Sequence, residues 1–414
     1  MTQISCRNFR WTVMLLLPLW LVFFGKDVRS QERRPDEVIE SVRAVAKTAI
    51  RTHFGPGPLS KILTPYDEFW DRMLEEHAVG FAATYSQIFQ FADFNGSDNS
   101  ILNHDISIFA DWTVFEHPIF GKGRFDLYVY HQADELLGAS TADSAENLGS
   151  SWLLSDADAD GSFTSLSALW WEQLLFDGHL DITLGQLDPT LLFDTNRYAG
   201  WDRWSFMATP VSSNPTRIFE SAGLGLYLEV LDWDIGYVIL TVMDADADGR
   251  YPDFKSLKNG RWTYFLEAGL IPTIPSLGKL EISVTLNAVE KTTAGPSSRA
   301  ALVSLSQDIG SRFGFFLRYG HNDGKLNDIE QMLSTGFVIK GIFDFANDWI
   351  GVAFMWAQPA DSSLRDQHGV EAYWRLQITE HVQFTPDLQI IVNPTFRPSA
   401  NLEVVSGLRL LFSF

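Results

Sequence analysis

Most of the chain alternates apolar and polar residues, from about Val79 to the last residue, Phe414. The alternating blocks are about ten residues long, which is the length of a tilted membrane-spanning strand. Because successive side chains of a β-strand point to opposite faces, each block predicts a strand with one apolar and one polar face. In the clearest block, residues 279–289, the apolar and polar residues are respectively Leu280, Ile282, Val284, Leu286 and Ala288, and Glu281, Ser283, Thr285 and Asn287.

About sixteen such blocks follow one another, an even number typical of outer-membrane barrels. The connections between them alternate in length. Short turns, as at residues 177–178 and 379–381, alternate with long connections at residues 133–163, 188–221, 244–260 and 321–331. A barrel inserted from the periplasm has short periplasmic turns and long external loops. The pattern therefore predicts an all-β fold, a transmembrane antiparallel β-barrel of about sixteen strands in the outer membrane of the cell.

Aromatic residues make up 14% of the chain, and a membrane barrel explains this surplus. Tryptophan rings near strand ends are typical of the interfacial girdle, where an amphipathic ring lies at headgroup depth. The last block ends in Phe414 and places Glu403 and Arg409 on its polar face. A terminal aromatic on such a strand resembles the signal that the barrel-assembly machinery recognises. The aromatics assigned to the apolar, lipid-facing side are Trp262, Trp349, Trp356, Trp374 and Phe412.

Two shorter parts precede the predicted barrel of residues 78–414. Residues 1–30 have the features of a secretory signal, because Arg7 and Arg10 precede an apolar stretch and a small-residue cleavage site. Cleavage near Gln31 would remove Cys6, the chain's only cysteine. Residues 31–77 show helical periodicity and predict a periplasmic helical segment. This segment either precedes the barrel or partly plugs it, and a loosely ordered leader is the alternative.

Charge and motifs exclude several classes of function. The formal net charge of −21 argues against nucleic acid as a partner, because phosphate binding needs a basic surface. The sequence contains no GxSxG or HExxH motif and no cluster of histidines. We therefore expect no enzymatic activity and no cofactor, with weakly bound calcium as the one exception.

The calcium hypothesis comes from the stretch DADADG, which occurs twice. Its aspartates are Asp156, Asp158 and Asp160 in the first copy and Asp244, Asp246 and Asp248 in the second. Neither copy has the glutamate that closes an EF-hand loop at its twelfth position. Both copies fall in predicted external loops, where clustered carboxylates would bind Ca²⁺ weakly, on the order of 10⁻⁴–10⁻³ M. The alternative is that they are solvated acidic turns.

A series of segments resembles the OprB-type carbohydrate-selective porins. The segments are ITLGQLDP, FDTNRYAG, SQDIGSRFGFFLRYG, NDWIGVAF and the tail VEAYWRLQITEHVQFTPDLQIIVNPTF, which is followed by GLRLLFSF. The resemblance is closest from Ile182 to the end, and it rests on the order and spacing of the segments. It implies a sixteen-stranded outer-membrane barrel, usually a homotrimer, that passes carbohydrates by diffusion. The DADADG loops are not part of this pattern.

The longest connection, residues 188–221, is the third long loop, and in general porins that loop folds into the barrel and narrows it. It mixes aromatic and charged side chains, as a sugar site requires, because sugars stack their C–H faces on rings and pair their hydroxyls with Arg and carboxylate groups. The candidate solute-binding residues are Arg197, Tyr198, Trp201, Asp202, Arg203 and Trp204. The alternative is that the two tryptophans only anchor the loop to the wall.

Charged residues on the polar faces of the strands are expected to point into the lumen, because a charge facing lipid at the midplane costs ~2–4 kcal/mol. Those assigned to the pore constriction are Arg124, Glu267, Arg318, Lys340, Glu371 and Arg375. Such charges can also simply pair across the wall.

The sequence thus favours a passive outer-membrane channel for carbohydrates and similar small polar solutes. Two alternatives stay open. One is a structural or adhesive outer-membrane barrel whose acidic external loops bind partners, lipopolysaccharide or divalent cations. The other is a secreted soluble carbohydrate-binding β protein.

Overall fold

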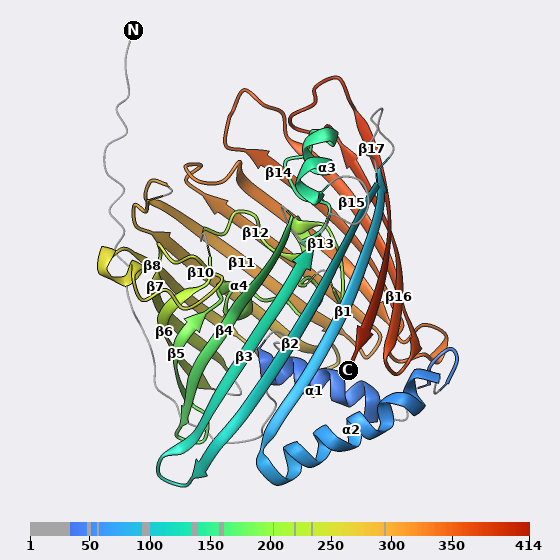
Figure 1. Ribbon diagram of the computed structural model, residues 1–414. Helices are drawn as coiled ribbons and strands as arrows, with labels where there is room; N and C mark the ends of the chain where they lie inside the picture. The colour runs from blue at the N-terminus through green and yellow to red at the C-terminus, as the bar shows by residue number, and fades with distance from the viewer. Residues whose placement is uncertain are drawn as a thin grey trace.

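The computed structural model describes residues 34–47, 51–55, 58–92, 100–133, 140–156, 161–201, 203–218, 221–232, 235–293 and 295–414. Its main element is an antiparallel sheet that closes on itself (Figure 1), because the first strand pairs with both the second and the last. Of the 17 strands in the described sheet, the two-residue β9 pairs only with the start of β10. The wall therefore has sixteen long strands, as predicted. The expected signal sequence lies outside the described residues.

The strands of the wall are long and follow one another around the barrel. Their bounds are β1 Val79–Ala92, β2 Ser100–His117, β3 Gly121–Ala133, β4 Ser162–Leu175, β5 Leu180–Leu187, β6 Gly223–Asp232, β7 Gly236–Asp244, β8 Trp262–Leu270, β9 Thr273–Ile274, β10 Gly278–Val289, β11 Ser298–Ile309, β12 Phe313–Asn322, β13 Ile329–Lys340, β14 Trp349–Pro359, β15 Gln367–Thr379, β16 Val382–Val392 and β17 Leu402–Ser413.

Two helices precede the first strand, and the other helical segments lie in the connections between strands. Their bounds are α1 Pro35–Lys47, α2 Pro58–His77, α3 Thr141–Leu148, α4 Pro189–Leu192 and α5 Thr209–Ser212, with 3₁₀ turns η1 Ser256–Asn259 and η2 Ile342–Asp344. No helix in the described part of the chain is both long and apolar enough to cross a membrane.

The alternation of the sequence is the alternation of the two faces of the wall. In β10, Thr285 is 1% exposed whereas its neighbour Leu286 is 50% exposed. The polar residues of the strand therefore face the lumen, and the aliphatic residues face lipid. The same arrangement holds for β17, where Arg409 is buried inside.

One aromatic residue assigned to the lipid-facing side was assigned wrongly. Trp349 lies on the same face of β14 as buried Ala353, while exposed Val352 and Phe354 occupy the other face. The guanidinium of Arg375, a lumen residue, lies 4.2 Å from the centre of the Trp349 ring. The alternation within β14 itself required this inward orientation, because residues an even number of positions apart share a face. Trp374 is exposed on the outer face as predicted.

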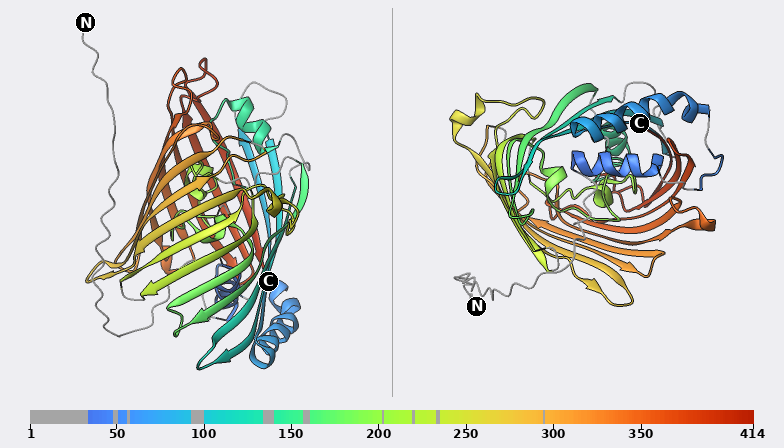
Figure 2. Two further views of the ribbon diagram at one scale, coloured as in Figure 1. Left: turned by 90° about the vertical axis from the view of Figure 1, so that its left-hand side faces the viewer. Right: turned by 90° about the horizontal axis from the view of Figure 1, so that it is seen from below.

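The two ends of the barrel differ. The long loops lie at the end opposite α1 and α2, which lie beside the chain's C-terminus at the other end (Figure 1). Seen from below, α1 crosses the opening inside the ring of strands (Figure 2, right). Its apolar residues Val38, Ile39 and Val42 are buried in the same apolar cluster as Phe109 of β2. Of residues 31–77, α1 thus lies inside the mouth of the barrel, and the periplasmic location of this segment stays a prediction.

Candidate functional site

The third long loop, residues 188–222 and called L3 below, folds into the lumen. The loop starts with the short helix α4. The Asp188 side chain caps this helix by accepting a hydrogen bond from the Thr190 N–H, and Pro189 occupies its first turn. Leu191, Leu192 and Phe193 are then buried against the wall. Figure 2 shows the loop inside the ring of strands in both views. The expectation that this loop narrows the barrel agrees with this position.

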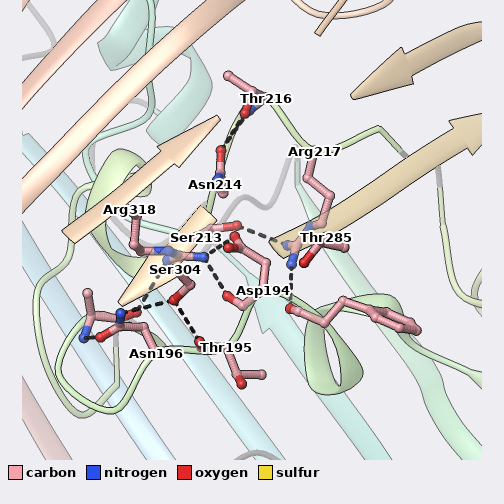
Figure 3. Close-up of polar contacts among 12 residues, drawn as sticks. Asp194, Thr195, Asn196, Ser213, Asn214, Thr216, Arg217, Thr285, Ser304 and Arg318 are labelled. Carbon is pink, nitrogen blue, oxygen red and sulfur yellow. Dashed lines mark hydrogen bonds and ion pairs between the residues drawn. The ribbon is translucent and has the colours of Figure 1, made fainter. Parts of the chain in front are cut away.

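Arg318 of β12 holds the loop from the wall and is fully buried. Its guanidinium pairs with the Asp194 carboxylate at 2.5 Å and also donates to the carbonyls of Asp194, Ala199 and Val211 at 2.8, 3.2 and 2.9 Å. Figure 3 shows Arg318 and Asp194 facing each other beside the Asn196–Ser304 contact. A buried charge needs such partners, because leaving it alone in the interior is costly.

Two wall carboxylates hold the loop by its backbone amides. Glu371 of β15 accepts from the N–H groups of Met207 and Ala208 at 2.5 and 3.2 Å. Glu267 of β8 accepts from the N–H of Asp194 at 2.8 Å and is buried. Both side chains lie in the lumen, as the sequence predicted. Their contacts give them the task of fixing L3 from two sides.

The remaining wall charges of the predicted set lie lower in the lumen. Arg375 donates to the carbonyl of Trp204 at 2.9 Å. Lys340 pairs with Asp308 at 3.2 Å, and the carboxylate of Asp308 also accepts from Tyr198 and Arg197 of the loop. Tyr198 is buried. These contacts position the lower edge of L3.

A cavity of about 220 Å³ lies between L3 and strands β3 and β4. Trp201 and Arg203 of the predicted set line it. Asp202 lies outside the described residues, and Trp204 packs against the neighbouring apolar cluster. The complete lining is Tyr128, Tyr130, Gln132, Asp156, Phe163, Asp188, Thr190, Trp201, Arg203, Ser212, Ser213 and Arg217.

Aromatic rings form a continuous series along the cavity. Phe163 lies 5.6 Å from Tyr130, which lies 5.4 Å from Tyr128, as measured between ring centres. Tyr128 lies 6.0 Å from Trp201 of the loop and stacks on Phe109 at 4.6 Å. The series leads from the external end of β4 into the lumen. Flat rings of this kind offer apolar faces to a solute that also carries hydroxyls.

Arg203 fixes the polar side of the same cavity. Its guanidinium pairs with Asp105 of β2 at 2.7 Å and donates to the Tyr128 hydroxyl at 3.1 Å. It also lies 5.2 Å from the centre of the Trp201 ring. Both ring and guanidinium are thereby held in one orientation, which is what a site for a planar polar contact requires.

Several lining residues were missed from the sequence. Tyr128 and Tyr130 stand on the same face of β3 as Arg124, which was assigned to the lumen, so the alternation could have revealed them. Arg217 and Asp188 belong to L3 itself but lie at its ends, outside the aromatic stretch that drew attention. Only the tertiary fold brings these two ends of the loop together on the cavity.

Below the cavity, a buried ionic cluster lies where α1 enters the lumen. Arg34 pairs with Glu172 of β4 at 2.5 Å and with Asp181 of β5 at 2.8 Å, and it lies 3.7 Å from Glu229 of β6. Burial alone would lower the pKa of this guanidinium, but the neighbouring negative charges raise it above its ordinary value, so Arg34 stays charged. Arg124 pairs with Glu172 in the same cluster.

Comparison with known proteins identifies the barrel. Residues 281–414 match the sequence model of a family described as carbohydrate-selective porin, OprB family. The high-pH structure of Pseudomonas putida OprB superposes with a TM-score of 0.70, over 84% of this chain and 97% of that one, at 15% identity. The C-terminal part of this chain thus matches the OprB family of carbohydrate-selective porins, and the barrel as a whole has the fold of an outer-membrane porin. A porin is a channel, not an enzyme.

Two proteins named as porins are similar to this chain in sequence, and a further solved porin is similar in fold. A protein named Porin AaxA from Chlamydia abortus is 22% identical over 73% of this chain and 68% of its own length. Its counterpart from Chlamydia muridarum is 25% identical over 59% of this chain and 54% of its own length. A Rhodopseudomonas blastica porin variant aligns with a TM-score of 0.50 at 13% identity. At these identities the solved structures describe the fold alone.

The two DADADG loops of the porin have different surroundings. Asp156 lines the cavity, while Asp158 and Asp160 lie outside the described residues. In the second copy, Asp244 accepts from Ser256, and Asp246 accepts from Asn259 at 3.0 Å, Thr293 at 2.9 Å and Arg261 at 3.1 Å. Asp248 lies 3.6 Å from Arg250. The described residues contain no group of three metal-ligating side chains, and weak calcium binding stays a prediction.

Proposed function

We propose that this porin lets small sugars and similar polar solutes diffuse passively past the cavity between L3 and strands β3 and β4. The observation that carries the proposal is the pairing, on one cavity, of aromatic rings from Trp201, Tyr128 and Tyr130 with the fixed guanidinium of Arg203. Rings would stack on the apolar faces of a sugar, and the guanidinium would donate to its hydroxyls.

The size and charge of the cavity support a small, neutral solute. Pockets for drug-sized ligands usually measure ~300–1,000 Å³, whereas this cavity measures about 220 Å³. Its charged lining residues are of both signs, with Arg203 and Arg217 beside Asp156 and Asp188. Mixed charges on fixed supports bind hydroxyls without favouring an ion of one sign.

Helix α1 acts in the proposal as a displaceable plug of the periplasmic mouth. It lies across the opening and is fastened to the wall through Arg34. Its buried apolar residues pack beneath the aromatic rings of the cavity. Solute would leave the lumen when the helix moves from this position, and the resident ion pairs would set how often it does so.

The remaining partners follow from the same assignment. The C-terminal strand is proposed to engage the barrel-assembly machinery through Phe414, and the external acidic loops to meet lipopolysaccharide, with Ca²⁺ bound weakly between them. Assembly as a homotrimer is proposed from the family resemblance.

Liposome swelling with sugars of increasing size tests the function. The whole porin and a variant lacking residues 34–47 are reconstituted side by side, so that a closed plug cannot be mistaken for an inactive channel. We expect monosaccharides to enter faster than larger sugars, and the variant to swell faster throughout. If neither protein admits any sugar while both run as folded, heat-modifiable barrels, the porin function proposed for the cavity fails and a structural or adhesive role is favoured.

A further inference from the structure

Helix α2 packs on the outside of the barrel. The ring of Trp70 stacks on that of Phe81 with the centres 4.3 Å apart and the planes 9° from parallel. Phe81 pairs with Ala110 on the neighbouring strand β2 and shares its outward face with exposed Ile108 and Trp112. Since this is the face that the barrel turns toward lipid, α2 covers a part of the lipid-facing wall.

The helix leaves an apolar strip uncovered. Successive residues of a helix are about 100° apart around its axis, so residues seven apart share a face. Ile62 and Phe69 are such a pair, and they are 71% and 45% exposed. They lie beside the face that contacts the wall through Tyr66 and Trp70. Exposed Glu76, a further seven residues on, ends the strip. As far as Phe69, the strip therefore continues the apolar surface of the wall.

The polar side of α2 is directed the other way, toward the mouth of the barrel. Asp71 pairs with Arg43 of α1, which lies inside that mouth. Asp67 lies 3.6 Å from His381 in the turn between β15 and β16. Around the helix axis, the wall-contacting residues lie between these two aspartates and the pair Ile62 and Phe69. The ion pairs thus orient the apolar strip away from the aqueous opening.

The depth of α2 coincides with the aromatic girdle. The helix runs directly into β1, and the first residue of that strand, Val79, pairs with exposed Trp112. The rings of Trp112, Phe125 and Trp171 form a band on the outer face, with centres 6.4 and 4.8 Å apart. Such bands mark the boundary between hydrocarbon and headgroups.

A neighbouring turn reaches the same level. The turn between β2 and β3 lies as low as α2 in Figure 1 and exposes Ile119 and Phe120. Apolar side chains at this level would be unfavourable in water, because each exposes a large apolar surface. Both features are accounted for if the membrane boundary includes them.

We infer that α2 is an interfacial helix seated in the inner, phospholipid leaflet of the outer membrane, with Ile62 and Phe69 in the boundary between acyl chains and headgroups. Its exposed charged residues are Lys61, Glu68, Arg72, Glu75 and Glu76, so it carries no basic excess that would select anionic lipid. Attachment then rests on apolar burial and on the contact with Phe81. A zwitterionic phospholipid is sufficient as the partner.

Spin labels at single cysteines test this placement in the whole porin. Cys6 is the chain's only cysteine, so a Cys6→Ser background accepts one new site at a time. The test sites are Ile62→Cys and Phe69→Cys, the matched controls on the same helix are Glu68→Cys and Glu75→Cys, and Leu286→Cys on β10 is the lipid-facing reference. The porin is reconstituted in phosphatidylethanolamine–phosphatidylcholine vesicles, and collisions with oxygen and with a water-soluble nickel chelate are compared.

The inference predicts a ratio of oxygen to nickel collisions at positions 62 and 69 that approaches the ratio at 286 and is several-fold above the ratio at 68 and 75. Nickel access at 62 and 69 equal to that at 68 would overturn it. Shielding of positions 62 and 69 from both reagents would also overturn the inference. If spin–spin broadening accompanied that shielding, a second copy of the chain would cover this face. In a Phe69→Glu background, the label at 62 should shift toward nickel access while the barrel stays heat-modifiable. An unchanged label there contradicts the inference too.

Discussion

The loop L3 and the helix α1 both obstruct the lumen, but the wall holds them in different ways. L3 is contacted from several strands by buried groups that include Arg318, Glu371 and Glu267, each bonded to the loop's backbone or its Asp194 carboxylate. Helix α1 is held by Arg34 in a cluster of carboxylates, by the ion pair of Arg43 with Asp71 of α2, and by three buried apolar residues.

This difference assigns different roles to the two obstructions. Moving L3 would break many buried hydrogen bonds at once, and each buried group left unpaired costs ~1–3 kcal/mol. Moving α1 would separate Arg34 and Arg43 from their carboxylate partners and expose three buried apolar residues, but it would leave the wall's hydrogen bonds to L3 intact. We therefore expect the loop to stay in place as a constriction, and we propose that the helix is the obstruction that moves.

The largest effect is expected from Arg318→Ala. The change leaves the Asp194 carboxylate buried without its partner, and breaking a buried pair in this way costs ~3–5 kcal/mol. We expect L3 to lose its fixed position, the thermal unfolding midpoint to fall and the conductance to become larger and noisier. The matched control is Arg312→Ala, because Arg312 and Asp344 form an exposed pair and such pairs contribute about 0–1 kcal/mol. Equal melting of both variants would show that L3 is not held as described.

A smaller effect, confined to opening, is expected from Arg34→Ala. Loss of an interaction worth roughly 1–3 kcal/mol shifts a two-state population about 5- to 150-fold. The open fraction in single-channel recordings should rise by a factor in that range, while the unfolding midpoint should fall less than in Arg318→Ala, because Arg124 stays paired with Glu172. Arg72→Ala, on the exposed surface of α2, serves as the control for a lost arginine near the same mouth. An unchanged open fraction in Arg34→Ala would mean that α1 is not the gate.

A still smaller effect is expected for the cavity itself. Trp201→Ala removes one ring of the aromatic series, and ring contacts contribute ~0.5–1.5 kcal/mol beyond burial. Sugar affinity, measured as blockade of the ionic current, should weaken by roughly 2- to 10-fold with the conductance otherwise preserved. Trp356→Ala on the outer face of β14 is the control, and it should leave the affinity unchanged. The cavity assignment fails if the two variants behave alike.

The smallest effect is expected in the external loop of residues 245–261. Burial alone would raise the pKa of Asp246. Hydrogen bonds from Thr293 and Asn259 and the charge of Arg261 outweigh burial and lower this pKa. A lowered carboxyl pKa stabilises the folded loop at every pH above the unfolded value, and this contribution is lost only as pH falls through the lowered value. At neutral pH, Asp246→Asn should therefore make the loop easier to cleave from outside, whereas Asp248→Asn, on an exposed side chain, should change cleavage less. Indistinguishable cleavage rates would remove the structural role given to Asp246.

The sequence predicted the wall well, because the period of two residues decides which side chains face lipid and which face the lumen. Glu267, Arg318 and Glu371 were placed inside from this alternation alone. Their partners were not predictable, since these depend on where the backbone of L3 comes to lie. The same limit applies to Arg34, which pairs with residues on β4 and β5 that are far away in the sequence.

Errors in the site arose where a side chain was assigned by type instead of by position. Trp349 was placed in the lipid-facing girdle because it is a tryptophan near a strand end, although the alternation of β14 turns it inward. Tyr128 and Tyr130 lie on a wall strand, and the aromatic residues of the loop alone do not predict that they line the same cavity. In a barrel, counting along the strand identifies the face more reliably than the chemistry of the residue.

Binding of sugar to the cavity beside Trp201 can be measured directly in the open channel. Single channels of the variant lacking residues 34–47 are recorded in a planar bilayer while a neutral monosaccharide is titrated on the external side. We expect a reversible, saturable reduction of the current that weakens in Trp201→Ala and in Arg203→Ala and persists in Trp356→Ala. A current that falls only in proportion to solution viscosity, equally in all four proteins, would contradict it.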